Sequence, residues 1–110
     1  MAYDEDLAAR IRGLLAGDGD VKEMKMFGGL AFLTGGNMAV AASGEGGLMV
    51  RVDPADSDEL VATTPARLVE MRGREMPGWL RVDSPDLEGG ELDAWVARGT
   101  AFARSLPPKR

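Results

Sequence analysis

Short apolar runs separated by glycines fill the segment from Val21 to Val52, and this pattern constrains the fold more than any other feature of the sequence. The runs span residues 24–27, 30–33, 38–42 and 48–52. They lack helical spacing, and their length is typical of β-strands. The glycine-rich segments 35–37 and 44–47 are short, and short connections join strands that run antiparallel. The segment therefore predicts an antiparallel meander with hairpin turns.

Helical spacing is found on either side of this meander. Near the N-terminus, apolar residues recur at helical intervals, at Leu7, Ile11, Leu14 and Leu15. A second helical pattern begins at Leu92 and stops at the paired prolines 107–108. Between the two, Asp53 and Pro54 predict the N-cap and first residue of a short helix that ends before Pro65. These patterns predict about three helices.

The remaining segment completes the predicted fold. Residues 67–75 are polar and turn-prone around Gly73, and the alternation of a strand resumes at Trp79. The predicted fold class is α+β, an antiparallel meander of about four to six strands flanked by about three helices. The expected order is α-β-β-β-(β)-α-β-β-α. The 110 residues fit one domain, 1–110, and residues 107–110 are expected to form a flexible tail.

The sequence contains no cysteine and no histidine, which excludes most hydrolase and metalloenzyme chemistry. Thiolate nucleophiles, triads with a histidine base and zinc sites built from these residues all need one or the other. We therefore predict no catalytic, cofactor-binding or metal-binding residue and no enzymatic activity. The apolar stretches are far shorter than the roughly 20 residues of a membrane span. Because the chain also starts with acidic residues, unlike a signal peptide, a cytoplasmic protein is expected.

Acidic residues outnumber basic ones by 18 to 13, and the formal net charge is −5. Nucleic-acid binding gains much of its affinity from contacts between basic side chains and phosphates. This balance disfavours direct binding to nucleic acid. The acidic clusters at 53–59 and 83–93 lack the ligand spacing of a calcium loop, and we interpret them as solvated helix N-termini.

Strand alternation places arginine and tryptophan on the sheet face that points away from the core. We name these residues, with the arginines around the turn at Gly73, the Arg/Trp surface: Met49, Arg51, Arg72, Arg74, Trp79 and Arg81. Such a surface can hold a phosphate, a carboxylate or an acidic partner segment. The alternative is that a helix covers Trp79 and that the arginines only form salt bridges with acidic neighbours.

The sequence contains seven methionines, several of them in the predicted strands. Those in strand patterns are Met24, Met26, Met38 and Met49. The flexible thioether side chain fills irregular gaps in a core and also occurs on adaptable binding surfaces. We expect the first role, with these side chains filling gaps in the core.

Three segments and a later glycine–tryptophan stretch occur in an order that resembles a known family. The segments are Met26-Phe27-Gly28-Gly29-Leu30-Ala31-Phe32-Leu33, Gly36-Asn37-Met38-Ala39-Val40, Leu48-Met49-Val50-Arg51-Val52 and Gly73-Arg74-Glu75-Met76-Pro77-Gly78-Trp79. Together they resemble the N-terminal domain of the TfoX/Sxy family of bacterial competence regulators. We define the signature residues as Met26, Phe27, Gly28, Gly29, Asn37, Met38, Gly73 and Trp79.

The resemblance implies an antiparallel sheet flanked by helices. For the named members it also implies a role as coactivator of competence genes, together with a cyclic-AMP receptor transcription factor. Those regulators resemble a two-domain design, so this chain is expected to be a stand-alone N-terminal domain. The resemblance supplies no catalytic residues.

Three classes of function fit these observations. The first is a non-enzymatic protein-interaction domain, a monomer or weak homodimer, whose partner is a protein such as a transcription factor. The second is a nucleic-acid-binding module that uses the Arg/Trp surface. The third is a small-molecule binder or an enzyme that works with carboxylates, Tyr3, lysine or arginine alone.

Overall fold

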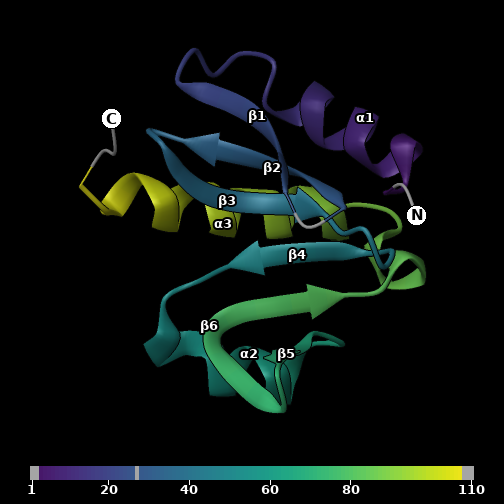
Figure 1. Ribbon diagram of the computed structural model, residues 1–110, viewed down its shortest axis with the longest axis vertical. Helices are drawn as coiled ribbons and strands as arrows, with labels where there is room; N and C mark the ends of the chain where they lie inside the picture. The colour runs from purple at the N-terminus through teal and green to yellow at the C-terminus, as the bar shows by residue number, and fades with distance from the viewer. Residues whose placement is uncertain (1–2, 27, 108–110) are drawn as a thin grey trace.

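One antiparallel sheet, with helices against one of its faces, makes up the part of the chain that the structure describes (Figure 1). The computed structural model describes residues 3–26 and 28–107. The α-helices and strands are α1 (Glu5–Leu14), β1 (Val21–Met26), β2 (Gly29–Thr34), β3 (Asn37–Ala42), β4 (Leu48–Arg51), α2 (Ser57–Thr63), β5 (Arg67–Met71), β6 (Arg74–Val82) and α3 (Glu91–Ser105). The strand order across the sheet is β1-β2-β3-β4-β6-β5.

The predicted meander, fold class and element order are confirmed. Short 3-10 turns precede α2 and α3, at Pro54–Asp56 and Ser84–Leu87. Residues 67–75, interpreted from the sequence as a polar turn, instead form β5, a tight turn and the start of β6. None of the helices in the described ranges combines the length and apolar character that crossing a bilayer requires.

The core lies between the sheet and the helices α1 and α3, which run behind the sheet in Figure 1. The register aligns inward-facing side chains in two rows across four strands: Leu30, Ala42, Leu48 and Val82 in one, and Phe32, Val40, Val50 and Leu80 in the other. Trp95 of α3 is 1% exposed and packs in this core with Leu7 and Ile11 of α1, as the helical spacing predicts. Leu14, which belongs to the helical pattern near the N-terminus, is exposed, and Phe102 of α3 is half-buried.

Polar contacts fix both ends of α1. Asp4 caps α1 by accepting a hydrogen bond from the N–H of Leu7. Arg12 of α1 donates two hydrogen bonds to Glu23 of β1, with Nε–Oε2 at 2.6 Å. These hydrogen bonds lower the pKa of Glu23.

The predicted tail begins at a residue that makes a tertiary contact. Pro107 is exposed, but its carbonyl oxygen accepts a hydrogen bond of 3.0 Å from Nδ2 of the buried Asn37. This contact ties Pro107, which follows α3, to the start of β3. Residues 108–110 lie outside the described residues.

The alternation of side chains between the two faces of β6 is interrupted at Pro77 and Gly78. On β5 the neighbouring residues Leu68 and Val69 pair with Leu80 and Met76 of β6, so β6 contains extra residues at this point. Gly78 has a φ of 88°, a conformation that favours glycine. Its N–H donates to Oγ of the buried Ser57, at 2.6 Å. The bulge allows Met76 and Trp79 to face the same cavity on the open side of the sheet.

Candidate functional site

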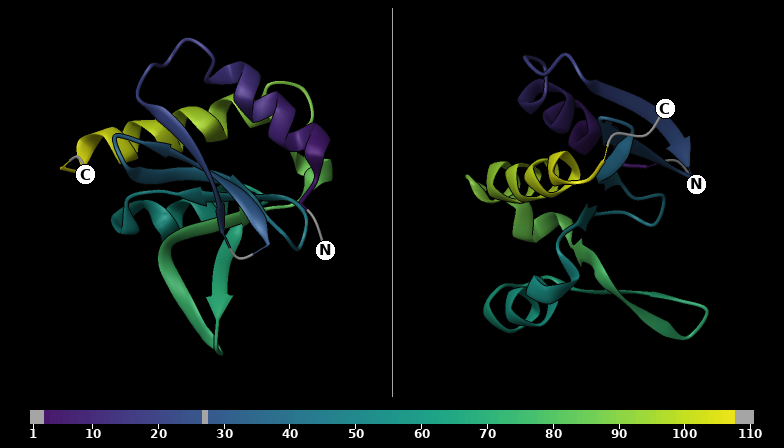
Figure 2. Two further views of the ribbon diagram at one scale, coloured as in Figure 1. Left: turned by 45° about the horizontal axis from the view of Figure 1, so that its top comes forward. Right: turned by 90° about the vertical axis from the view of Figure 1, so that its left-hand side faces the viewer.

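The open face of the sheet, opposite the helices, is hollowed into a cavity of about 290 Å³. The right-hand view of Figure 2 shows the helices on one side of the sheet, while β1 and the β5–β6 hairpin curl toward the other. These two elements stand on either side of the flatter strands β2, β3 and β4. The cavity therefore has a floor on the central strands, and the outer strands contribute to its walls.

Small residues make the floor. Ala31 of β2 and Ala41 of β3 pair directly with each other, and Gly29 lies at the start of β2. Gly29 cannot be replaced without a shift, because a Cβ atom there would collide with the backbone carbonyl oxygen of Ala42. The absence of large side chains at these three positions gives the cavity its depth.

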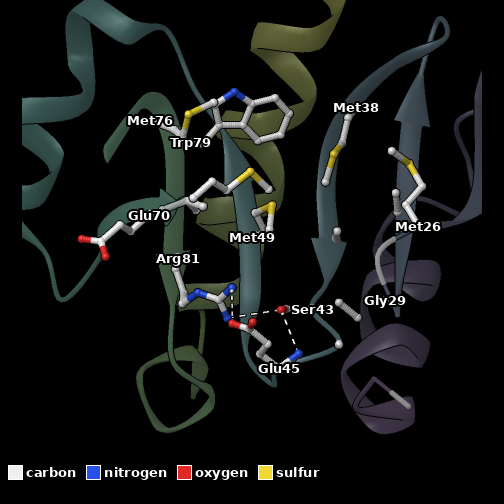
Figure 3. A pocket seen from close by; sticks show the side chains of 16 residues that line it. Met26, Gly29, Met38, Ser43, Glu45, Met49, Glu70, Met76, Trp79 and Arg81 are labelled. Atoms are coloured by element: carbon white, nitrogen blue, oxygen red, sulfur yellow. Dashed lines mark hydrogen bonds and ion pairs between the residues drawn. The ribbon is translucent and has the colours of Figure 1, made fainter. Parts of the chain in front are cut away.

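Methionine and tryptophan side chains make the walls. Met26 and Met38 lie on one side, and Met49, Met76 and Trp79 lie on the other (Figure 3). The expectation that the strand methionines fill gaps in the core is therefore wrong. Met49 alternates with the core residues Leu48 and Val50 and so projects from the opposite face. The irregular pairing between β2 and β3 passes over Ala39 and puts Met38 on this face as well. Met24, on the same strand as Met26, is 52% exposed.

A single guanidinium lies at one end of the cavity, among the described residues that line it. Arg81 of β6 donates from Nη1 to Oγ of Ser43 at 3.2 Å and to the carbonyl oxygen of Gly46 at 3.1 Å. Its Nη2 is 3.3 Å from Oε1 of Glu45, whose side chain is 84% exposed, whereas that of Arg81 is only 15% exposed. These contacts fix the guanidinium of Arg81, a largely buried positive charge, at the end of an apolar cavity (Figure 3).

The Arg/Trp surface is only partly brought together. Met49, Trp79 and Arg81 line the cavity. Arg51 lies beside it, with its guanidinium carbon 5.2 Å from the centre of the Trp79 ring and 5.6 Å from that of Phe102. Arg72 and Arg74 are exposed around the β5–β6 turn.

The alternative interpretation of this surface holds for part of it. Arg67, which is not part of this surface but pairs with Arg81 in the sheet, forms a bidentate salt bridge with Asp83, and its hydrogen bonds lower the pKa of Asp83. Arg81 is also paired with an acidic neighbour. Trp79, however, faces the cavity rather than a covering helix.

Several of the signature residues have identifiable roles in the structure. Met26, Gly29, Met38 and Trp79 line the cavity, and Asn37 holds the end of α3. Gly28 and Gly73 are in turns with φ angles of 78° and 77°. Phe27 lies outside the described residues.

Sequence reasoning missed the floor and part of the wall. Met71 and Met76 line the cavity. The polar interpretation of residues 67–75 left Met71 unplaced, and Met76 precedes the strand pattern that was expected to begin at Trp79. A usable signal was present, because Ala31 and Ala41 alternate with large core residues and so mark a face without bulky side chains. Among the described residues, no group of three or more acidic side chains is arranged to hold a metal ion.

Comparison with known proteins identifies the family. No curated protein matches the chain closely enough to count as a relative. The sequence model of the TfoX N-terminal domain matches residues 13–103, which include the whole meander, both walls of the cavity and nearly all of α3. The chain therefore belongs to the TfoX N-terminal domain family.

Proposed function

We propose that this chain is a non-enzymatic interaction domain that binds a protein partner on the open face of its sheet. It acts without a cofactor, in the cytoplasm, as a monomer or weak homodimer. The observation that carries the proposal is the apolar open face, where methionines and Trp79 surround a hollow that the described helices leave uncovered. Exposed apolar patches of this kind mark interaction sites, and methionine side chains adapt to the shape of a partner.

The charges around this face favour a partner segment that is acidic as well as apolar. The chain as a whole has a net charge of −5, yet exposed basic side chains flank the open face. Lys22 shares a face of β1 with Met24 and Met26, and Arg74 shares a face of β6 with Met76. A basic rim around apolar anchors fits an acidic amphipathic segment.

The family supports a regulatory role for this interaction. The chain is competence-regulator-like, and the resemblance implies coregulation together with a transcription factor. A transcription factor is therefore the first partner to test. Direct nucleic-acid binding is less well supported, because acidic residues pair with Arg67 and Arg81 and the net charge is negative.

A pull-down from native cytosol, with nuclease treatment of the eluate, tests the proposal. The test variant is Met24→Glu/Met71→Glu, which adds two charges at exposed positions on the open side. The matched control is Ala94→Glu/Ala101→Glu, at exposed positions on α3. We expect a protein that survives nuclease, is lost with the test variant and is kept with the control.

The remaining outcomes contradict the proposal in different ways. A partner retained by both variants would place the interaction elsewhere on the molecule. Recovery of nucleic acid alone would favour the nucleic-acid-binding alternative. Recovery of nothing by the wild-type chain would remove the support for a protein partner.

A further inference from the structure

The cavity has the layout of a site for an elongated amphipathic ligand. Trp79 and Met76 lie at one end, Arg81 lies at the other, and methionine side chains line the length between them (Figure 3). We propose that the cavity binds a small amphipathic monocarboxylic acid, with its apolar chain along the methionines and its carboxylate on Arg81. This proposal goes beyond the protein interaction and does not depend on it.

The walls suit a flexible apolar chain. A small-molecule site is typically a hollow lined by apolar side chains, with a few polar groups that fix the orientation of the ligand. Thioether side chains are polarisable and rotate freely, so they can close around a chain that has no fixed shape. The floor of Gly29, Ala31 and Ala41 leaves room for such a chain between the walls.

Arg81 supplies the charge that selects an acid. Guanidinium groups bind carboxylates in a planar, two-pronged geometry. The hydrogen bonds to Ser43 and Gly46 hold this group at the end of the cavity, and its side chain is mostly shielded from water. Arg81 is the one positive charge among the described residues that line the cavity, whose other charged residues are Glu45 and Glu70. Because there is only one positive charge, a ligand with one acidic group matches it.

Glu45 occupies the place that a ligand carboxylate would take. The side chain of Glu45 is almost fully exposed, and its contact with Arg81 at 3.3 Å is a single ion pair. This pair contributes little, because the exposed Glu45 side chain loses entropy when it is held there and water screens its charge. A carboxylate tethered to an apolar chain inside the cavity can therefore displace Glu45 from Arg81.

A titration of the purified chain with octanoate, followed by NMR of the methionine methyl groups, tests the proposal. We expect the signals of the cavity methionines to shift: Met26, Met38, Met49, Met71 and Met76. The Met24 signal serves as the internal control, because Met24 is exposed on β1 outside the cavity lining. Octanol, which has the same chain without the charge, should bind about ten- to a hundredfold more weakly.

Two variants with opposite expected effects keep the proposal falsifiable. Arg81→Gln should remove the preference for octanoate over octanol, whereas the control Arg67→Gln, at an exposed salt bridge outside the cavity, should keep it. Glu45→Gln should tighten octanoate binding, because it removes the competing carboxylate and leaves Arg81 in place. Glu45→Gln still tests the proposal if Arg81→Gln does not fold.

Several results would overturn the assignment. Absence of binding, equal affinity for octanoate and octanol, or unchanged octanoate affinity in Glu45→Gln would each contradict it. Shifts at Met24 alone would place the probe outside the cavity. Because the titration contains no partner protein, its failure would contradict only the carboxylate site, and a failed pull-down would contradict only the protein interaction.

Discussion

Gly99 is the point where α3 comes closest to the sheet, and it offers a sharp test of the packing. A Cβ atom on Gly99 would lie 2.5 Å from the carbonyl oxygen of Ala39 and 3.0 Å from Cγ1 of Val40. The first contact is with backbone, which cannot rotate away. We therefore expect Gly99→Ala to push the helix off β3 and to destabilise the protein.

The magnitude follows from two opposing effects. Forcing an extra methyl group into a packed core costs about 1–3 kcal/mol, occasionally more. Alanine in place of glycine inside a helix stabilises the protein by about 1 kcal/mol, because alanine has the higher helix propensity. Because the 2.5 Å contact is with backbone, the cost falls in the upper part of this range, and the expected net loss in the free energy of unfolding is about 1–2 kcal/mol.

Gly13 of α1 provides a control with the opposite sign. Among the described residues, nothing lies within 4 Å of a Cβ built on Gly13, so only the gain in propensity remains. Gly13→Ala should stabilise the protein by about 0.5–1 kcal/mol. Urea denaturation followed by tryptophan fluorescence measures both variants. If Gly99→Ala proves as stable as the wild type, α3 does not pack as closely on β3 as described.

Three further predictions concern the core, the stacked arginine and the link between α1 and β1. Trp95→Ala should cost about 3–5 kcal/mol in urea denaturation because it empties the centre of the core, and a loss below about 1 kcal/mol would contradict its burial. Arg51→Ala should cost about 1 kcal/mol in the same assay, since it removes a cation from two aromatic rings, and an unchanged midpoint would argue against the stacking. Hydrogen bonds from Arg12 lower the pKa of Glu23 in the folded state, so its stabilising effect is present above the ordinary value of about 4.3 and is lost as the pH falls through the folded-state pKa. The stability difference between wild type and Glu23→Gln should therefore shrink in a denaturation series from about pH 7 to about pH 3, and a constant difference would refute this link.

The fold was largely predictable because its signals are local. Glycine-rich turns between short apolar runs define the meander, and the spacing around Leu7 and Leu92 defines the first and last helices. Two strands were expected before the last helix, but the limits of β5 were not predicted, because the charged residues Arg67 and Glu70 leave it only a short apolar run. The bulge at Gly78 also puts Met76 and Trp79 on the same face, whereas plain alternation would place residues three apart on opposite faces.

The candidate site was less predictable, because alternation assigns residues to faces but does not say which face is covered. Met49 alternates with the core residues Leu48 and Val50, and an apolar side chain at such a position can belong to either a second core or an open cavity. Which face is covered depends on where α1 and α3 cross the sheet. Arg81 was placed on the correct strand face from sequence, but its contacts with Ser43 and Gly46 depend on the long-range pairing of β4 with β6.

The residues that determine the fold differ from those that determine how large a molecule the cavity can hold. Ala31 and Ala41 are neighbours of the core rows in sequence, yet they lie outside the core cluster. A larger side chain at either position would make the hollow shallower, while the residues facing the helices stayed the same. Two chains with this backbone can therefore share a core and accept molecules of different size, and membership of the family predicts the sheet more reliably than its ligand.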